Sequence, residues 1–185
     1  MRPFRIAAAS AAGLVAFLAG CAQSAGPKQV TEVSGVKNLS RDGRIYVAGA
    51  PTPEGLRQLK QRGVTTVIDL RTETEAGTQE AQAAQAEGLN YIHIPMASDK
   101  LTEQQIDAFM EAMQTSDGDP VLVHCASGNR AGAMYGLYLG KSGQCPASEA
   151  LRRAKAAGLK NEKLETDVAE ALDDAPPEPE NRESH

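Results

Sequence analysis

The stretch PVLVHCASGNRAGAMYGLYLGK, residues 120–141, carries the pattern that decides the fold of this chain. It opens with a short apolar run of the kind that is typical of a buried strand. From about residue 130 it reads as a helix, and only a short loop that contains a glycine separates the two. A buried strand that leads through a short loop into a helix is typical of a parallel sheet with helices packed on it.

The same alternation of strand and helix extends over most of the chain. Apolar and β-branched runs predict strands at 44–49, 64–70, 89–96 and 120–124. Apolar spacing, capping residues and Ala- and Glu-rich composition predict helices at about 53–62, over much of 74–88, and at 101–114, 130–141, 147–158 and 161–172. We therefore predict one α/β domain with a central, mostly parallel sheet of four to five strands and helices on both faces.

The domain is expected to span residues 41–172. Residues 21–40 contain Gly, Ser and Thr without a clear pattern, which predicts a flexible tether. Residues 173–185 are acidic and proline-rich, which predicts a disordered tail. The chain has no Trp and few aromatic residues, so its core has to be built from aliphatic side chains and Met.

The N-terminal residues form a separate signal. Residues 1–20 combine a basic start with a short apolar run, which indicates a secretory signal peptide rather than a membrane-spanning helix. The run ends in Leu-Ala-Gly-Cys, residues 18–21, which resembles the lipobox of bacterial lipoproteins. This resemblance implies a lipid on Cys21 and a location in the cell envelope facing the periplasm, and Ala22 favours the outer membrane. The alternative is an ordinary secretory signal with a chance cysteine.

The charge of the chain argues against one class of partner. The formal net charge is −5, and the signal segment holds two arginines and no acidic residue, so the remainder carries −5 − 2 = −7. Nucleic-acid binding needs clustered Lys and Arg, which an acidic domain of this kind does not offer.

The two cysteines outside the signal are not expected to form a disulfide. The predicted helix between Cys125 and Cys145 holds their ends roughly 15 Å apart, whereas a disulfide needs Cα atoms within about 7 Å. Cys145 is therefore expected to be a small buried hydrophobic residue. Cys125 is expected to be a free thiol.

The residues after the fourth strand form a candidate anion site. Ligands of parallel sheets bind beyond the carboxyl ends of the strands, where Cys125 lies. The backbone N–H groups of the loop, together with the N-terminal end of the next helix, attract an anion, and Gly128 permits the tight turn. Arg130 offers a planar fork for two oxygens of an oxyanion. These groups favour a thiolate nucleophile at the base of the loop.

The histidines show no pattern that indicates a catalytic or metal-binding role. His124 ends a buried strand and is expected to be a core residue, which could hydrogen-bond to the loop backbone. His93 is expected to be a plain strand residue. No metal constellation is evident in the sequence, and no cofactor is expected.

The segments RIYVAGAPTPEGLRQLKQRGVTTVIDLRTETE, YIHIPMASDKLTEQQIDAFMEAM and PVLVHCASGNRAGA together resemble the dual-specificity branch of the protein tyrosine phosphatases. More narrowly, they are similar to small bacterial phosphatase-like domains that also occur joined to β-lactamase-like hydrolases. The resemblance covers most of residues 41–170. It implies a phosphatase that forms a cysteine–phosphate intermediate on a phosphorylated protein or small molecule.

The resemblance also implies a role for individual residues. Cys125 is the expected nucleophile, and Asp99, before the predicted helix 101–114, is the expected general acid. The expected phosphate-binding residues are Ala126, Ser127, Gly128, Asn129 and Arg130.

Other charged residues near the site are expected to have structural roles or to be exposed to solvent. Asp69 is a less favoured substitute for the acid, and Asp69 and Arg71 are expected to tie the strand end to neighbouring loops. Glu73 and Glu75 are expected to be solvated charges at a helix start.

Two departures from the phosphatase pattern leave alternatives open. Arg130 follows Cys125 by five residues instead of six, and Ala131 replaces the usual Ser or Thr. The shorter loop is similar to the active loop of rhodanese-type sulfurtransferases, in which the cysteine carries a persulfide. A lipoprotein that binds an anion without turnover is the third interpretation.

Overall fold

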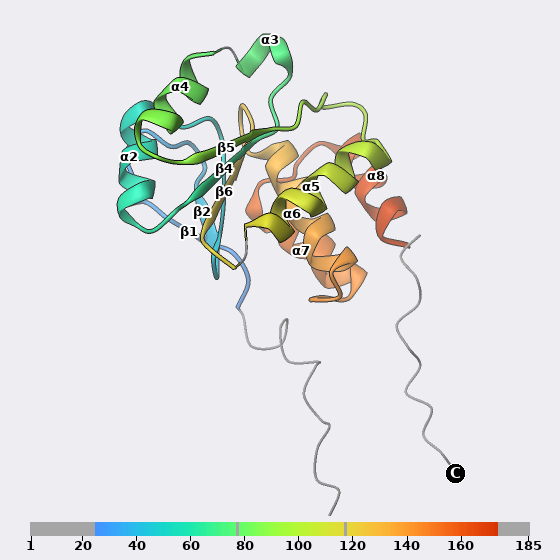
Figure 1. Cartoon of the computed structure of the whole chain (residues 1–185). Helices are drawn as coiled ribbons and strands as arrows, with labels where there is room; N and C mark the ends of the chain where they lie inside the picture. Colours follow the sequence, from blue (N-terminus) through green and yellow to red (C-terminus); the bar gives the residue numbers. More distant parts are fainter. Residues whose placement is uncertain (1–24, 77, 117, 174–185) are drawn as a thin grey trace, which may run out of the picture.

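The computed structural model describes residues 25–76, 78–116 and 118–173, and it contains a six-stranded sheet in the order β1-β2-β3-β6-β4-β5 (Figure 1). The strands are β1 (Lys28–Gln29), β2 (Ser40–Asp42), β3 (Ile45–Ala48), β4 (Thr66–Asp69), β5 (Asn90–His93) and β6 (Val121–His124). The last four in this spatial order pair in parallel, and β1 and β2 add an antiparallel edge. The predicted α/β fold with a mostly parallel sheet is therefore confirmed, and the sheet is extended by two short strands.

Helices cover both faces of this sheet (Figure 1). The helices are α2 (Pro53–Gln61), α3 (Glu73–Ala76), α4 (Gln79–Ala86), α5 (Glu103–Thr115), α6 (Asn129–Lys141), α7 (Ala147–Ala157) and α8 (Glu162–Asp173). One hydrophobic cluster packs α2 and α4 on one face, and a larger cluster packs α5 to α8 on the other. The short helix α3 lies beyond the carboxyl ends of the parallel strands, where the candidate site is expected.

Local sequence signals account for the helix boundaries. The side chain of Thr52 caps the first turn of α2, which begins with a proline. Thr102 and Gln105 form the predicted capping box at the start of α5. The helix expected over much of 74–88 is instead divided into α3 and α4.

The N-terminal part of the domain begins earlier than predicted. Residues from Lys28 onward belong to the fold, because β1 pairs with β2 through Lys28 and Arg41, and Val33 and Leu39 are buried in the core. Only part of 21–40 could therefore act as a tether. The weak pattern of this segment hid its two strands, each of which is only two or three residues long.

Several predictions fall outside the described residues. These are the signal peptide, the lipidated Cys21 and nearly all of the tail from 173 to 185. The described part of the domain ends with α8 at Asp173, close to the predicted end at 172. Among the described residues, no helix combines the length and apolar character that a membrane crossing requires.

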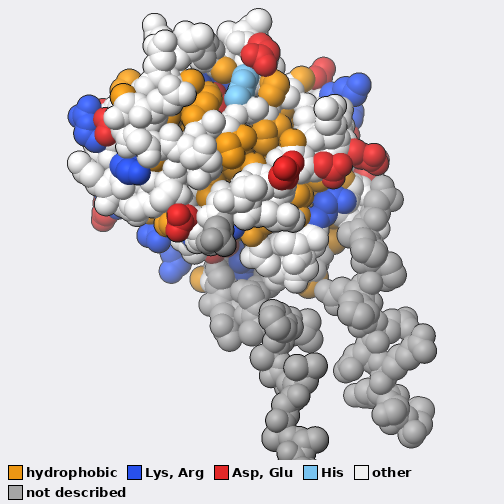
Figure 2. All heavy atoms as spheres, viewed as in Figure 1, with side chains coloured by type: hydrophobic (Ala, Val, Ile, Leu, Met, Phe, Trp, Pro, Cys, Tyr) orange, Lys and Arg blue, Asp and Glu red, His pale blue; other side chains and the backbone are white. Residues whose placement is uncertain are grey.

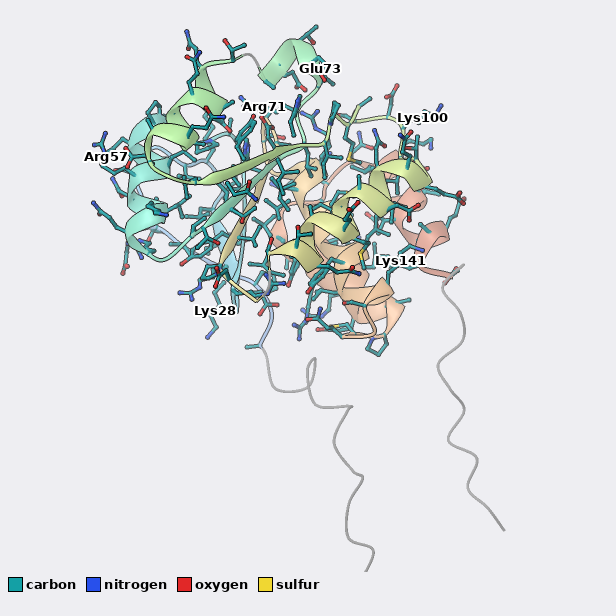
Figure 3. The ribbon with its side chains drawn as sticks, viewed as in Figure 1. Lys28, Arg57, Arg71, Glu73, Lys100 and Lys141 are labelled. Carbon is teal, nitrogen blue, oxygen red and sulfur yellow. The ribbon has the colours of Figure 1, made fainter. Side chains whose placement is uncertain are left out.

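The two ends of the sheet differ in their side chains (Figure 3). Arg71 and Glu73 lie at the end where the parallel strands finish, whereas Lys28 and Lys141 lie toward the opposite end. Figure 2 shows hydrophobic side chains gathered on the face over β5 and α5. Partly buried Ile92 and Met110 belong to these two elements and pack against the core. Arg71 and Glu73 thus lie at the edge of the sheet where the candidate site is expected.

Candidate active site

Cys125 lies at the base of the loop that joins β6 to α6. Its side chain is fully buried, and its Sγ atom accepts a hydrogen bond from the Gly128 N–H group at 3.1 Å. Gly128 has a φ of +99°, in the left-handed region that favours glycine. Helix α6 begins at the next residue, so its positive N-terminal end lies at the thiol. Cys125 is a free cysteine, which agrees with the prediction that it does not pair with Cys145.

The outer side of the loop is held by residues that flank β2 and β3. The Ala50 N–H group donates to the carbonyl of Ala126 at 3.3 Å, and the Asn38 side-chain amide donates to the carbonyl of Ser127 at 2.9 Å. Ser127 also forms an isolated bridge with Gly49. Because these contacts engage carbonyl groups of the loop, its N–H groups remain for the concave side, where an anion would bind.

A second support comes from the connection between α7 and α8. The Oδ1 atom of Asn129 accepts hydrogen bonds from the backbone N–H groups of Lys160 at 2.6 Å and Asn161 at 3.1 Å. Gly158 packs so closely that a Cβ atom there would lie 2.9 Å from the carbonyl oxygen of Gly128. The side chain of Asn129 thus anchors the loop, and its backbone N–H group remains the candidate for phosphate. The loop is therefore held in place from two sides by the rest of the domain.

Arg130 is buried, with only 3% of the residue exposed. Several oxygen atoms accept hydrogen bonds from its guanidinium and hold it in place. Its Nη1 atom donates to the carbonyls of Met96 at 2.7 Å and Leu70 at 3.3 Å. The same atom and Nη2 donate to the two carboxylate oxygens of Glu75, at 2.7 and 2.9 Å. Burial alone would lower the pKa of Arg130, but Glu75 and the neighbouring Cys125 raise it above its ordinary value. The arginine is therefore a permanent cation held beside the thiol.

Glu75 lies in the first turn of α3 with its side chain 39% exposed, as predicted, but it also pairs with Arg130, which was not predicted. Its hydrogen bond with Arg130 is the main cause that lowers its pKa to about 2, so it is a carboxylate at neutral pH. Burial opposes this shift, and the Thr72 backbone and hydroxyl groups support it. Glu73, on the same short helix, has a side chain that is 78% exposed, as predicted. Sequence spacing could not distinguish the two glutamates, because their partners lie on other elements.

Asp99 lies in the connection between β5 and α5 and is exposed to solvent. The pKa of Lys163 on α8 is raised, mainly by its hydrogen bond with Asp167, and Asp99 contributes to this shift. Within the described ranges, no hydrogen bond or ion pair joins Asp99 to the Cys125 loop. The structure therefore places Asp99 on an exposed connection near Lys163 of α8 and does not bring it into contact with the Cys125 loop.

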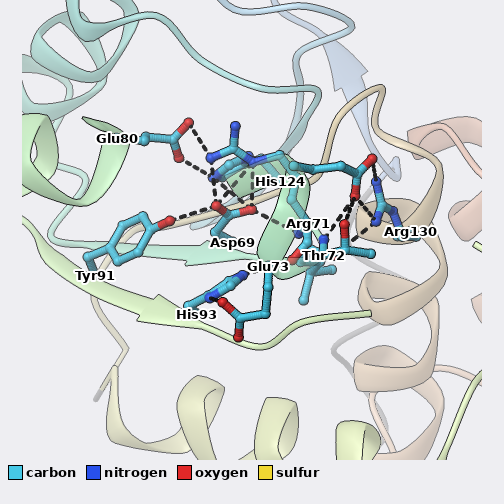
Figure 4. A network of polar contacts seen from close by, with 11 residues as sticks. Asp69, Arg71, Thr72, Glu73, Glu80, Tyr91, His93, His124 and Arg130 are labelled. Atoms are coloured by element: carbon cyan, nitrogen blue, oxygen red, sulfur yellow. Dashed lines mark hydrogen bonds and ion pairs between the residues drawn. The ribbon is translucent and has the colours of Figure 1, made fainter. Parts of the chain in front are cut away.

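A buried polar network lies beside the loop (Figure 4). The carboxylate of Asp69 accepts hydrogen bonds from the Arg71 guanidinium, at 2.6 Å from Nη2, and from the hydroxyl of Tyr91 at 2.6 Å. Burial would raise the pKa of Asp69, but the hydrogen bonds from Arg71, the nearby His124 and Tyr91 lower it to about 2. A carboxyl group that remains ionised at neutral pH cannot donate a proton. Asp69 is therefore a structural residue that ties the strand end to its neighbours, and not a substitute for the general acid.

His124 is fully buried, as expected of a core residue, but it faces acidic side chains and not the loop backbone. Its Nε2 atom lies 2.7 Å from a carboxylate oxygen of Glu80 and 3.8 Å from one of Asp69. The angles at these contacts do not make a hydrogen bond, so the interaction is electrostatic. The contact with Glu80 could not be predicted from the sequence, because Glu80 lies in α4, far from His124 along the chain.

Asp69, Glu80 and His124 are also residue types that bind metals, and their potential ligand atoms lie within 4.8 Å of one another. The guanidinium of Arg71 already bridges the two carboxylates, at 2.6 Å from Asp69 and 2.8 Å from Glu80. It occupies the place that a cation would take between them. The cluster is therefore an ion-pair network that joins β4, α4 and β6.

Comparison with known proteins places this chain in a family. The family model described as "DSP-PTPase phosphatase fused to NAD+ Kinase" matches residues 22–172. The chain belongs to this family. The matched residues include the strand, loop and helix around Cys125, and the printed description of the family is that of a dual-specificity-type phosphatase. The resemblance noted in the sequence is confirmed as to family.

The chain is also similar to individual proteins and solved structures. The beta-lactamase hydrolase-like protein of Xylella fastidiosa (strain Temecula1) is 36% identical over 99 residues, which cover 51% of this chain and 23% of that protein. The chain thus spans about a quarter of the length of such curated relatives. A phosphatase candidate (DUF442) from Shewanella putrefaciens CN-32 is 27% identical with a TM-score of 0.67, over 77% of this chain and 96% of that one. The fold also matches Pseudomonas aeruginosa TpbA bound to phosphotyrosine, at 21% identity and a TM-score of 0.64, over 82% of this chain and 90% of that one.

Proposed function

We propose that this protein hydrolyses phosphoric monoesters through a covalent cysteine–phosphate intermediate. The observation that carries the proposal is the position of Cys125. Its Sγ atom lies at the base of a preformed loop, 3.1 Å from the Gly128 nitrogen, with the fixed guanidinium of Arg130 beside it. A buried sulfur that accepts a hydrogen bond from an N–H group at a helix start and lies beside a cation is suited to attack an electrophile that carries negative charge.

In the first step the Cys125 thiolate attacks phosphorus, so that an S–P bond forms while the P–O bond to the leaving group breaks. The N–H groups of the loop and Arg130 hold the remaining phosphoryl oxygens, whose charge they neutralise. Asp99 gives its proton to the leaving oxygen, which departs as an alcohol or a phenol. The exposed connection that carries Asp99 is consistent with access to a bound substrate.

In the second step water attacks phosphorus while Asp99, ionised after the first step, accepts a proton from the water; a new P–O bond forms and the S–P bond breaks. The products are inorganic phosphate and the regenerated thiolate. Ala131, which is fully buried, has no hydroxyl to stabilise the departing sulfur. The second step is therefore expected to be slower than the first.

The five-residue spacing from Cys125 to Arg130 supports one competing function. A sulfurtransferase would carry a persulfide on Cys125 and would transfer sulfur to a thiophilic acceptor. The family match favours the phosphatase, and binding of an anion without turnover is the remaining possibility.

One experiment separates these functions. The full chain is assayed with an aryl phosphate, and in parallel with thiosulfate and cyanide. Phosphate release that is abolished by Cys125→Ser, with labelled phosphate trapped on Cys125 after acid quench, is the expected result. Thiocyanate formation without phosphate release would overturn the proposal. Phosphate binding with neither activity would leave an anion-binding protein.

The role of Asp99 has its own test. A general acid must be protonated, so activity falls on the alkaline side of the pH–rate profile when that proton is lost. Asp99→Asn is expected to remove the alkaline limb and to slow hydrolysis of alkyl phosphates more than that of nitrophenyl phosphate, whose leaving group needs no proton. An unchanged profile would exclude Asp99 from the mechanism.

We also propose a lipid anchor on Cys21, on the strength of the Leu-Ala-Gly-Cys sequence at 18–21. The protein would then act in the cell envelope, facing the periplasm, with the outer membrane favoured. Cys21→Ser is expected to move the protein from the membrane fraction to the soluble fraction. Retention of the variant in the membrane fraction would exclude the anchor.

A further inference from the structure

A hollow of about 630 Å³ lies beside the Cys125 loop. Two loop residues, Ser127 and Asn129, form part of its wall, and the connection between α7 and α8 forms another part. Asn38, which holds the outer side of the loop, completes the junction. The volume falls within the range of about 300–1,000 Å³ that is typical of sites for small molecules.

The charge of this hollow is opposite to that of the chain. Lys155 and Lys160 line it, together with amide and hydroxyl side chains, and none of the described residues in its wall is acidic. Lys155 is paired with Glu165 of α8 at 2.8 Å, whereas no ion pair involves Lys160 among the described residues. In a chain with a formal net charge of −5, this combination creates a local preference for anions.

The hollow is also attached directly to the phosphate loop. Asn129 precedes Arg130 in the chain, and its side chain accepts a hydrogen bond from the Lys160 backbone at 2.6 Å. Lys160 lines the hollow together with Ser127 and Asn129 of the loop, and its flexible four-carbon stem lets its ammonium group reach an anion bound there. Because Gly158 packs against the carbonyl of Gly128, the distance between the hollow and the loop is fixed.

We propose that this hollow is a second anion subsite and that the substrates are small phosphate esters that carry a second anionic group, a phosphate or a carboxylate. The inference rests on the proposed function, because the loop at Cys125 has to receive the phosphate ester that is cleaved. The second group lies in the hollow, where Lys160 supplies the charge and the surrounding amides supply hydrogen-bond donors. The subsite raises affinity for the substrate without taking part in the bond changes.

The experiment compares two matched series of substrates with the full chain. One series consists of α,ω-alkanediol bisphosphates of increasing chain length, and the other of the corresponding ω-hydroxyalkyl monophosphates. The bisphosphate of optimal length is expected to have a KM about tenfold lower than that of its monophosphate, with a similar kcat. The optimal length then measures the distance between the two anion sites.

Two variants with the same change of charge locate the effect. Lys160→Gln is expected to remove about fivefold of the bisphosphate advantage and to leave the monophosphate unchanged. Lys141→Gln is the control, because Lys141 lies toward the opposite end of the sheet from the loop (Figure 3). Equal KM values for the two series in the wild-type protein, or equal effects of the two variants, would overturn the inference.

Failure of the inference can be distinguished from failure of the proposed function. If an aryl phosphate is hydrolysed but the two series have equal KM values, the proposed phosphatase activity is supported and the proposed subsite is excluded. If nothing is hydrolysed, calorimetry of Cys125→Ser with the same bisphosphate and monophosphate still tests the hollow. Tighter binding of the bisphosphate that depends on Lys160 supports the subsite, and equal binding overturns it. If Lys160 instead increased the affinity for acidic phosphopeptides but not for bisphosphates, the inference of a small-molecule substrate would be overturned. The second anionic group would then belong to a phosphoprotein.

Discussion

The guanidinium of Arg130 and the carboxylate of Glu75 form a two-point ion pair, with Nη1 to Oε2 at 2.7 Å and Nη2 to Oε1 at 2.9 Å. Two backbone carbonyls hold Nη1 as well. This pair occupies one edge of the guanidinium, and so it orients the other edge toward the Cys125 loop. Glu75 is thus a positioning residue, whose effect on the reaction passes through Arg130.

Replacement of Glu75 by Gln is expected to reduce kcat by about tenfold, because the amide cannot hold both nitrogens of the guanidinium and Arg130 loses its orientation in the transition state. Steady-state kinetics with an aryl phosphate measure this effect. Glu73→Gln removes the same charge from the same helix at an exposed position, and it should leave kcat within about twofold of the wild-type value. A similar loss in both variants would mean that general charge, and not orientation, matters.

Because Gly158 packs closely against the loop, adding a single methyl group at this position is expected to affect both stability and phosphate binding. Gly158→Ala is expected to destabilise the fold by about 1–3 kcal/mol and to weaken binding of inorganic phosphate, because the new Cβ atom would press against the Gly128 carbonyl. Gly143→Ala is a matched control, since Gly143 also has a positive φ but a Cβ atom there would meet nothing within 4 Å. Thermal unfolding and phosphate calorimetry distinguish the two variants. Unaltered phosphate binding in Gly158→Ala would show that the loop does not depend on this contact.

The absence of a hydroxyl at Ala131 predicts accumulation of the cysteine–phosphate. Stopped-flow assays of the wild-type protein should show a burst of released phenol, followed by a slower steady rate. Ala131→Ser should raise the steady rate about tenfold, since a hydrogen bond to a charged sulfur contributes roughly 1.5–3 kcal/mol. Ala133→Ser introduces the same hydroxyl at another buried position of α6 and should not change the rate. A wild-type reaction without a burst would contradict this prediction.

The lowered pKa of Asp69 predicts how stability depends on pH. Because the pKa falls from 3.8 to about 2 on folding, ionised Asp69 stabilises the protein above about pH 4. This contribution, about 2 kcal/mol, is lost as the pH falls toward 2. Denaturant unfolding of the wild-type protein and Asp69→Asn should therefore show a free-energy difference that shrinks by that amount between pH 5 and pH 2. A difference that does not vary with pH would contradict the assigned shift.

Much of the fold could be predicted from local patterns. The apolar runs identify β3, β4, β5 and β6 as strands, although β5 is only partly buried. The Thr102 capping box marks the start of α5, because such signals act over a few residues. β1 and β2 gave no comparable signal, since strands of two or three residues depend on their pairing partners.

The chemistry of the loop could be predicted from the sequence, because a thiol, a glycine and an arginine lie close together between a buried strand and a helix. The side chains that support the loop could be identified only in the folded structure. Glu75, Glu80 and Asn129 reach their partners across different elements, so no spacing along the chain records those contacts. The hollow at Lys160 likewise exists only because folding brings the α7–α8 connection against the loop.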